Sequence, residues 1–274
     1  SWTTHKKYLT AYKLIIIIIS MNVGGMMIVS RIKYSPLYLK AKTELVKMIK
    51  KGDFENNKLP PEDKLSEMLG ISRSTIREAL ITLDREGIIT KKQGIGNLIH
   101  KSTLEVKMRI DLVQDFIKLL ENGGYKASVK RINSGWIDNI SQFEIKIPSI
   151  KDKKYFLNEF LYLANNQPAI LATNIIPESA LNMPLQNKGI PFNSFKGFFN
   201  LLSKHTNEEL SHSITRFIPS KVDMKISEIL KIKENEPIIK REEFYYGIFD
   251  KLICCSEITF HPSLVNLTIV RKLD

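Results

Sequence analysis

The stretch LGISRSTIREALITLDREGIITKKQGIGN, residues 69–97, joins an amphipathic segment to a short basic one. Apolar side chains at helical spacing predict a helix with one buried face, formed by Ile76, Leu80 and Leu83. Ser72 is suited to cap this helix, and Gly87 ends it. The segments IITKK and NLIH then flank QGIG, which predicts a β-hairpin with glycine at its tip.

Two more helices are predicted upstream of this stretch. LYLKAKTELVKMIKKG repeats apolar residues at helical spacing and ends at Gly52. In the next helix Pro61 suits the first position, acidic residues follow in the first turn, and Gly70 ends it. The order helix, helix, tight turn, helix, hairpin is that of a winged helix-turn-helix, whose recognition helix enters the DNA major groove.

The third helix carries the side chains expected to read DNA. Arg73 and Arg77 are four residues apart and share a face, and arginine is suited to bidentate contact with guanine. The polar residues at the helix start are suited to phosphates, and the hairpin offers basic side chains and a close backbone approach. A merely solvated helix face is the alternative. The DNA-contacting residues predicted on this helix and hairpin are Ser72, Arg73, Ser74, Thr75, Arg77, Lys91, Lys92, Gln93 and Gly94.

The charge of the chain agrees with a polyanionic partner. The 274 residues carry a formal net charge of +12. Residues 30–103 contain 15 Lys and Arg against 9 Asp and Glu, so half of the excess lies in about a quarter of the chain. Such an excess favours nucleic acid or anionic lipid as a partner. The 43% hydrophobic content is enough for one large or two ordinary folded domains.

The cysteines and the first residues bear on the compartment. Cys254 and Cys255 are adjacent, which disfavours a mutual disulfide, and two cysteines are too few for a zinc site. They are expected to be reduced thiols of a cytoplasmic protein.

Residues 1–30 are expected to be a disordered or non-native leader. Their uncharged stretch, residues 14–29, is shorter than the roughly 20 residues of a membrane span. A membrane-tethered regulator that uses this stretch is the alternative.

A second region follows a linker predicted at residues 101–110. Helices are expected at 111–124, 194–205 and 222–232. Strands are expected near 127–137, 153–164, 168–176, 209–219, 237–249, 251–260 and 264–270. Because strands come in adjacent runs, residues 111–274 are predicted to form an α+β domain with an antiparallel sheet.

The first region resembles a known DNA-binding domain. Residues 31–100 are predicted to form it, and within 35–100 the segments PLYLKAKTELVKMI, KLPPEDKLSEMLGISRSTIREALITLDREGII and KKQGIG resemble the winged-helix domain of the GntR family of bacterial regulators. The resemblance implies DNA contacts by Arg73, Thr75 and Arg77 and by the wing around Gly94. The family usually has a DNA-contacting arginine at the position of Asp63. Lys64 is expected to substitute for it in part, and an altered operator is the alternative.

The second region resembles the UTRA effector-binding domain of the HutC subfamily. The resemblance rests on FLYLANNQPAILATNIIPESAL, on IKENEPIIKREEFYYGIFDKLICCSEITFHPSLVNLTIVRK and on the order of elements. It implies a chorismate-lyase-like α+β fold that binds small metabolites. Phe160 and Tyr162 stand where sugar-phosphate binders have two arginines, so an aromatic or less charged ligand is expected. The effector-binding residues predicted are Asp115, Phe160, Tyr162, Asn174, Arg241 and Glu257.

Several of these effector residues have plainer alternatives. Arg241 and Glu257 are equally compatible with a cross-strand ion pair, Tyr162 with a core position, and Asn174 with an exposed strand position. His261, just before a proline, is more typical of a turn than of a ligand contact.

The resulting hypothesis is a transcription regulator that acts as a repressor. A homodimer would bind a palindromic operator in double-stranded DNA, and a small metabolite of unknown identity would control it. No cofactor, metal or catalytic set is expected, because the five histidines are scattered and no nucleophile–base pattern occurs. No membrane partner is expected, because the uncharged stretch at 14–29 is too short for a span. A lyase-like enzyme is the other class, since the implied fold of the second region is shared with a lyase.

Overall fold

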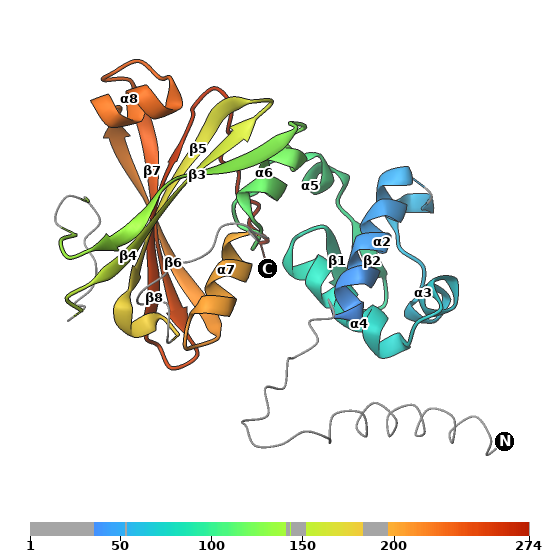
Figure 1. Ribbon diagram of the computed structural model, residues 1–274. Helices are drawn as coiled ribbons and strands as arrows, with labels where there is room; N and C mark the ends of the chain where they lie inside the picture. The colour runs from blue at the N-terminus through green and yellow to red at the C-terminus, as the bar shows by residue number, and fades with distance from the viewer. Residues whose placement is uncertain (1–35, 53, 141–142, 144–151, 183–196, 274) are drawn as a thin grey trace, which may run out of the picture.

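The computed structural model describes residues 36–52, 54–140, 143, 152–182 and 197–273. A small helical part and a larger part built on a sheet lie beside each other (Figure 1). The predicted leader, including residues 14–29, lies outside the described ranges. Within these ranges no helix is both long enough and apolar enough to cross a membrane.

The helical part has the predicted order of elements. The helices are α2 (Leu37–Lys51), α3 (Glu62–Leu69) and α4 (Arg73–Arg85), with a short 3-10 turn η1 (Glu55–Asn57) before α3. The antiparallel hairpin is formed by β1 (Ile89–Lys92) and β2 (Gly96–Ile99). Gly52 and Gly70 end α2 and α3 in the left-handed conformation, with φ of 81° and 64°, which glycine adopts without a Cβ penalty.

One apolar cluster holds these three helices and the hairpin together. The side chains that the amphipathic pattern of α4 assigns to the inside are fully buried, and α2, α3 and β1 contribute partners. Its fully buried members include Leu45, Leu65, Ile76, Leu80, Leu83 and Ile89. Burying a side chain of this size stabilises the fold by about 1.5–3 kcal/mol. The opposite face of α4 is therefore free to carry polar and basic side chains.

The larger part begins after a short helix, α5 (Lys101–Glu105), which lies inside the segment predicted as a linker. Its helices are α6 (Phe116–Asn122), α7 (Phe198–His205) and α8 (Met224–Leu230), with a 3-10 turn η2 (Glu178–Ala180). Its strands are β3 (Ala127–Ile137), β4 (Tyr155–Ala164), β5 (Gln167–Pro177), β6 (Leu210–Lys221), β7 (Pro237–Gly247) and β8 (Leu252–Phe260).

These strands form one antiparallel sheet in the order β3-β4-β5-β8-β7-β6. Each half of the sheet is a run of strands consecutive in the chain, and the β5–β8 pairing joins the halves. Helices α6 and α7 pack on the face turned toward the helical part, and α8 packs on the other face (Figure 1). The main core fills the first of these faces, where Phe156, Phe160, Tyr162 and Leu202 are buried.

Three predicted elements differ from the structure. The helix expected at 194–205 begins only at Phe198, after Gly197 with a φ of 107°, and residues 194–196 lie outside the described ranges. The expected strand at 264–270 is absent, and Thr268 makes only an isolated parallel bridge to Arg109. The apolar spacing there fits an extended tail that lies against another segment equally well. The helix expected at 111–124 begins only at Phe116, because the Asp115 side chain accepts a hydrogen bond from the Ile117 N–H and caps it.

The adjacent cysteines lie in β8, as two free and buried thiols. Burial raises the pKa of Cys254 to about 12 and also raises the pKa of Cys255. The thiols therefore stay protonated and unreactive at neutral pH.

Candidate nucleic-acid interface and effector pocket

The N-terminus of α4 is a cluster of hydroxyl groups. Ser72 caps the helix, and its Oγ accepts a hydrogen bond from the Thr75 N–H at 3.2 Å. The same Oγ lies 2.9 Å from the Ser74 Oγ and 2.8 Å from the Thr75 Oγ1. The positive end of the helix and three hydroxyls therefore converge at one point, which suits an anion such as a phosphate.

The two arginines of α4 point away from the core. The side chains of Arg73 and Arg77 are 65% and 60% exposed, while Ile76 between them is fully buried. Their guanidinium groups are therefore open to a ligand on the solvent side. This is the orientation that the amphipathic pattern predicts.

Two acidic residues of α3 hold these arginines. The Glu62 Oε2 accepts hydrogen bonds from the Nε and Nη2 of Arg77 at 3.1 and 3.0 Å, and its Oε1 accepts one from the Lys91 Nζ at 3.0 Å. Arg73 pairs with Asp63. The hydrogen bond from Arg77 is the main cause that holds the pKa of Glu62 below its usual value. One carboxylate thus links α3, α4 and the hairpin.

The role of Glu62 was not predicted from the sequence. From the sequence, the acidic residues of this helical turn are expected to be partners of the helix dipole, and Asp63 to replace a DNA contact. The only sequence signal for this role is the opposite charge of Arg77, 15 positions later. The two side chains come together only when the turn between α3 and α4 is folded.

The hairpin presents its tip to solvent. Lys92, Gln93 and Gly94 are exposed, and the Ile95 N–H donates to the Lys92 carbonyl at 3.1 Å to close the turn. Gly94 has a φ of 76°, which favours glycine at this position. At the other end, the Asp84 Oδ1 accepts a hydrogen bond from the Lys91 N–H at 2.9 Å and attaches the hairpin to α4. Lys64 is exposed on α3.

A pocket of about 450 Å³ opens in the larger part, between α6, β6, β7 and the segment that precedes α6. Its walls carry aromatic rings beside charged and hydroxyl side chains. The lining residues include Arg109, Asp111, Phe116, Ser213, Phe217, Arg241, Glu243 and Ile269.

Each cation in the deep wall of the pocket already has a carboxylate partner. The Arg241 Nη2 lies 2.7 Å from the Glu243 Oε2, and the guanidinium stands 5.1 Å from the Phe116 ring centre. Ser213 donates to the Glu243 Oε1 at 2.8 Å. The Nη2 and Nε of Arg109 donate to both oxygens of Asp111, at 2.5 and 3.2 Å. These pairs are largely buried, so the pocket holds compensated rather than free charge.

Of the six predicted effector residues, only Arg241 is among the pocket-lining residues. Phe160 and Tyr162 are fully buried core residues, and Tyr162 packs edge-on against Phe116 with ring centres 5.2 Å apart. Asp115 caps α6 and also accepts from the Phe198 N–H at 2.7 Å, so it ties α6 to α7. Tyr162 and Asp115 therefore support the pocket wall through Phe116 and the start of α6, and Phe160 packs beside Tyr162 in the core.

Asn174 and Glu257 lie away from the pocket. Asn174 is buried rather than exposed, and its Oδ1 accepts from the Ser256 hydroxyl at 2.7 Å. Glu257 lies on the other face of the sheet, 3.6 Å from the Lys240 Nζ. The alternative of an Arg241–Glu257 ion pair is therefore wrong: Glu257 stands opposite Glu242 in the register, and residues one position apart on a strand point to opposite faces.

Arg109, Asp111 and the β6 residues were missed because they come from segments far apart in the sequence. Arg109 falls inside the predicted linker, and β6 carries no charge or aromatic pattern that stands out. Only the paired Arg109 and Asp111, two positions apart, gave a local signal. Among the described residues no group of three or more His, Cys, Asp or Glu side chains is placed to hold a metal ion.

The comparisons with known proteins match both parts of the chain. Residues 37–99 match the family described as bacterial regulatory proteins, gntR family, and residues 149–266 match the UTRA domain. The chain therefore combines a match to a gntR-family DNA-binding region with a match to a UTRA domain that follows it. The UTRA match covers strands β4 to β8 of the six-stranded sheet and the pocket-lining residues of β6 and β7. The larger part of the molecule, which adds α6 and β3, is called the UTRA domain.

Two relatives illustrate the extent of the likeness. The chain is 37% identical to the transcriptional regulator GgaR of Escherichia coli K12 over 67 residues, which is 24% of this chain and 27% of GgaR. It is 22% identical to the transcriptional repressor NagR of Bacillus subtilis over 205 residues, covering 74% of this chain and 82% of NagR. The match thus spans only about a quarter of GgaR.

A solved structure supports the fold of the whole arrangement. The Bacillus subtilis protein YydK, described as a possible transcriptional regulator, superposes with a TM-score of 0.64 at 17% identity, covering 86% of this chain and 99% of YydK. At this identity the likeness concerns the fold alone.

Proposed function

We propose that this GntR-family chain is a transcription regulator that binds operator DNA through α4 and the β1–β2 wing, and that a small metabolite in the UTRA pocket controls this binding. The observation that carries the proposal is the outward orientation of Arg73 and Arg77 over a fully buried apolar face. The exposed wing tip at Lys92 and the α4 N-terminus supply phosphate contacts on the same domain.

DNA binding requires the arginines to change partners. In the free protein Arg77 is bonded to Glu62, and both side chains reach solvent. Exposed pairs of this kind are worth about 0–1 kcal/mol, so guanine and phosphate groups displace the carboxylate at little cost. Two copies of the chain would place their α4 helices in successive major grooves of a palindromic site, about 34–36 Å apart.

The pocket favours a ligand without an excess of negative charge. Arg109 and Arg241 are both compensated by neighbouring carboxylates, so a phosphate dianion would meet Asp111 and Glu243 without a free cation. The Phe116 and Phe217 rings offer apolar surface beside the Ser213 hydroxyl. We therefore propose a neutral or zwitterionic metabolite with an aromatic or apolar body, of a size that suits about 450 Å³.

Control of DNA binding follows from differential affinity. A ligand shifts the protein only as far as it binds one arrangement of the two domains better than the other. We propose that the metabolite favours the arrangement that does not fit DNA, so that the protein acts as a repressor released by its ligand.

The decisive experiment selects duplexes from a random pool with the full chain and measures their affinity at several salt concentrations. A specific regulator binds the selected site about 10³-fold or more tighter than random DNA, and the affinity falls steeply with salt. Indifference to every duplex at low ionic strength overturns the proposal. A thermal-shift screen of neutral, zwitterionic and phosphorylated metabolites then tests the ligand class, and stabilisation by phosphorylated compounds alone contradicts it.

An enzymatic role has a direct test of its own. Hits from the screen are incubated with the protein and recovered unchanged if the pocket only binds them. Turnover of a hit would favour the lyase-like alternative.

A further inference from the structure

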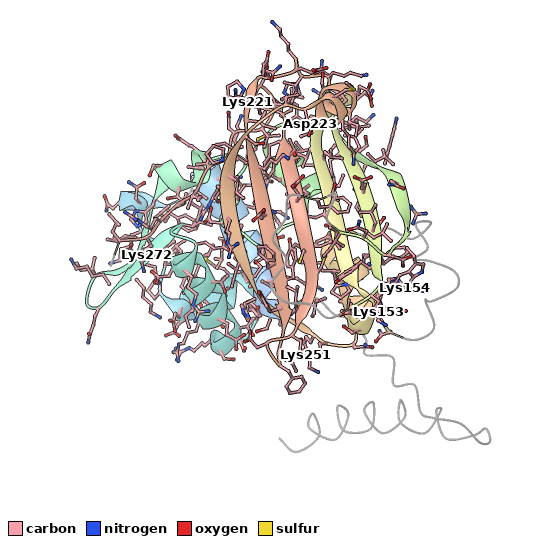
Figure 2. The ribbon with its side chains drawn as sticks, turned by 90° about the vertical axis from the view of Figure 1, so that its left-hand side faces the viewer. Lys153, Lys154, Lys221, Asp223, Lys251 and Lys272 are labelled. Atoms are coloured by element: carbon pink, nitrogen blue, oxygen red, sulfur yellow. The ribbon has the colours of Figure 1, made fainter. Side chains whose placement is uncertain are left out.

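The tail after β8 runs from the UTRA pocket to the DNA-binding domain. Figure 1 shows the C-terminal end between the two parts of the molecule, and Figure 2 shows Lys272 beside the DNA-binding domain and apart from the sheet. This is the segment predicted as a seventh strand of the sheet, and it instead connects the two sites that the proposed function requires to be coupled.

The first end of the tail is bonded to the pocket wall. The Ile110 N–H donates to the Thr268 carbonyl at 3.0 Å, and the Val270 N–H donates to the Asp111 Oδ1 at 3.4 Å. The side chain between these two bonds, Ile269, lines the pocket together with Arg109 and Asp111. A ligand in the pocket therefore touches both the tail and the residues that hold it.

The second end of the tail is bonded to α4. The Lys272 Nζ lies 2.7 Å from the Asp84 Oδ2, and both side chains are about three-quarters buried, with 28% and 24% exposed. Val270 packs against Gly87, where an added Cβ would come within 3.2 Å of the Val270 Cγ1. The tail thus contacts the DNA-binding domain at the C-terminal end of the recognition helix.

Asp84 joins the tail to the wing. Its other oxygen accepts the Lys91 N–H at 2.9 Å, at the point where β1 leaves the domain core. Burial acts to raise the pKa of Asp84, yet the Lys272 ammonium and the Lys91 N–H hold that pKa below its usual value. The carboxylate is therefore charged at neutral pH and bonded on both sides.

We propose that residues 268–272 form a strap that transmits the state of the UTRA pocket to the DNA-binding domain through the Lys272–Asp84 ion pair. This inference rests on the proposed function, because it concerns the control of the same DNA-binding surface. A ligand that moves Ile269 displaces the strap between its two anchors. Because Lys272 is bonded to Asp84, the displacement shifts Asp84. The shift then reaches the C-terminal end of α4 and, through the Lys91 N–H, strand β1 of the wing.

A first experiment measures the distance between the domains in the full chain without any ligand. Spin labels are placed at Lys40→Cys on α2 and at Lys154→Cys just before β4, both exposed, and labelled protein is diluted with unlabelled protein. The native thiols are buried and do not react. The parent chain should give one narrow distance distribution, and Lys272→Ala should broaden it. Arg271→Ala, which removes an exposed cation next to Lys272, is the matched control and should change nothing.

A comparison of single and double variants separates the loss of the Lys272–Asp84 ion pair from a general destabilisation of the fold. Asp84→Asn keeps an oxygen for the Lys91 N–H but loses the charge, so it should broaden the distribution as Lys272→Ala does. The double variant should add nothing further, because both changes remove the same contact. Additive broadening, or an unchanged distribution in Lys272→Ala, overturns the strap.

A substitution that fills the pocket without a ligand tests whether the strap transmits the state of the pocket to the DNA-binding domain. Ile269→Trp places a large ring at the pocket wall and should change the affinity for the selected duplex about fivefold or more. In the Lys272→Ala background the same substitution should have no effect. An equal change in both backgrounds shows that the signal takes another route. If the parent chain binds no duplex, the proposed function fails, and the label distances still decide whether the strap exists.

Discussion

The two sites of the molecule use the same chemical unit, an arginine paired with a carboxylate, at opposite degrees of burial. At the DNA-binding face, Arg77 and Glu62 are 60% and 21% exposed. In the UTRA pocket, Arg241 and Glu243 are each 10% exposed. Solvent screens the first pair, whereas the second pair has given up its hydration and depends on its partner.

The difference in burial matches the task proposed for each site. A surface that must release its arginines to DNA needs pairs that break at little cost. A pocket that discriminates among small ligands needs charges that stay in place, because a rigid wall rejects a ligand that leaves a polar group unpaired. Breaking the buried pair should therefore lower the free energy of unfolding. Breaking the exposed pair should mainly change the affinity for DNA.

The largest effect is expected from the buried pair. Arg241→Met leaves the Glu243 carboxylate without its cation, so the free energy of unfolding should fall by about 3–5 kcal/mol. Urea unfolding of the full chain measures the change. Arg77→Met, at the exposed pair, is the matched control and should cost no more than about 1 kcal/mol.

A double variant sharpens this result. Arg241→Met with Glu243→Met removes both charges and should recover most of the lost stability, since an apolar pair of similar volume replaces a buried ion pair with little loss. Equal losses for the two single arginine variants would contradict the distinction between the sites.

The next effect is expected in sequence recognition. Arg77→Ala should weaken binding to the selected duplex by about 1–3 kcal/mol and relax the preference at one base pair. Binding titrations against duplexes changed at single positions measure it. Arg85→Ala, at the other end of the same helix and also exposed, should leave the preference intact. An equal loss on all sequences would show that Arg77 contacts phosphate only.

A smaller and uniform effect is expected at the wing tip. Lys92 is exposed, and its removal by Lys92→Ala should take away about one phosphate contact. The affinity should fall by a similar factor on every duplex, and the slope of log affinity against log salt should decrease by about one. Gln93→Ala, which carries no charge, is the control for the slope. An unchanged slope in Lys92→Ala would place that lysine off the DNA.

The DNA-binding domain was predictable from sequence because its determinants are local. The spacing of Ile76, Leu80 and Leu83 defines the buried face, and Gly52 and Gly70 mark helix ends through their backbone freedom. The order and nearly all boundaries of its helices and strands follow from such signals. What remained hidden was Glu62, because its partners are on other elements and depend on the folded turn.

The UTRA domain was predictable in its strands and less so in its pocket. Strand-like apolar segments placed β4, β5 and β8, but a pocket assembled from five segments has no single pattern in the sequence. The resemblance directed attention to Phe160 and Tyr162, which the apolar faces of the helices cover completely. The tail at 264–270 was misassigned because its apolar spacing fits a strand and an extended strap equally well.

The smallest effect is expected from the carboxylate that competes with DNA. Glu62→Gln keeps an acceptor for Arg77 but removes the charge, so Arg77 and Lys91 become easier to transfer to phosphates. The affinity for random duplex should rise about two- to fivefold, the range set by an exposed pair of about 0.5–1 kcal/mol. Glu67→Gln, the same charge change on an exposed position of α3, is the control.

The pH dependence of this variant identifies the charge as the cause. Arg77 lowers the pKa of Glu62 from the ordinary value of 4.5, so the pair is fully formed above pH 4.5 and is lost as the pH falls through the lowered pKa. The difference between the parent chain and Glu62→Gln should therefore be constant near neutral pH and vanish in acid. A variant that binds random DNA no better than the parent at neutral pH would show that Glu62 keeps Arg77 in the DNA complex, and the exposed pair would then act as a fixed part of the interface, as the buried pair does in the pocket.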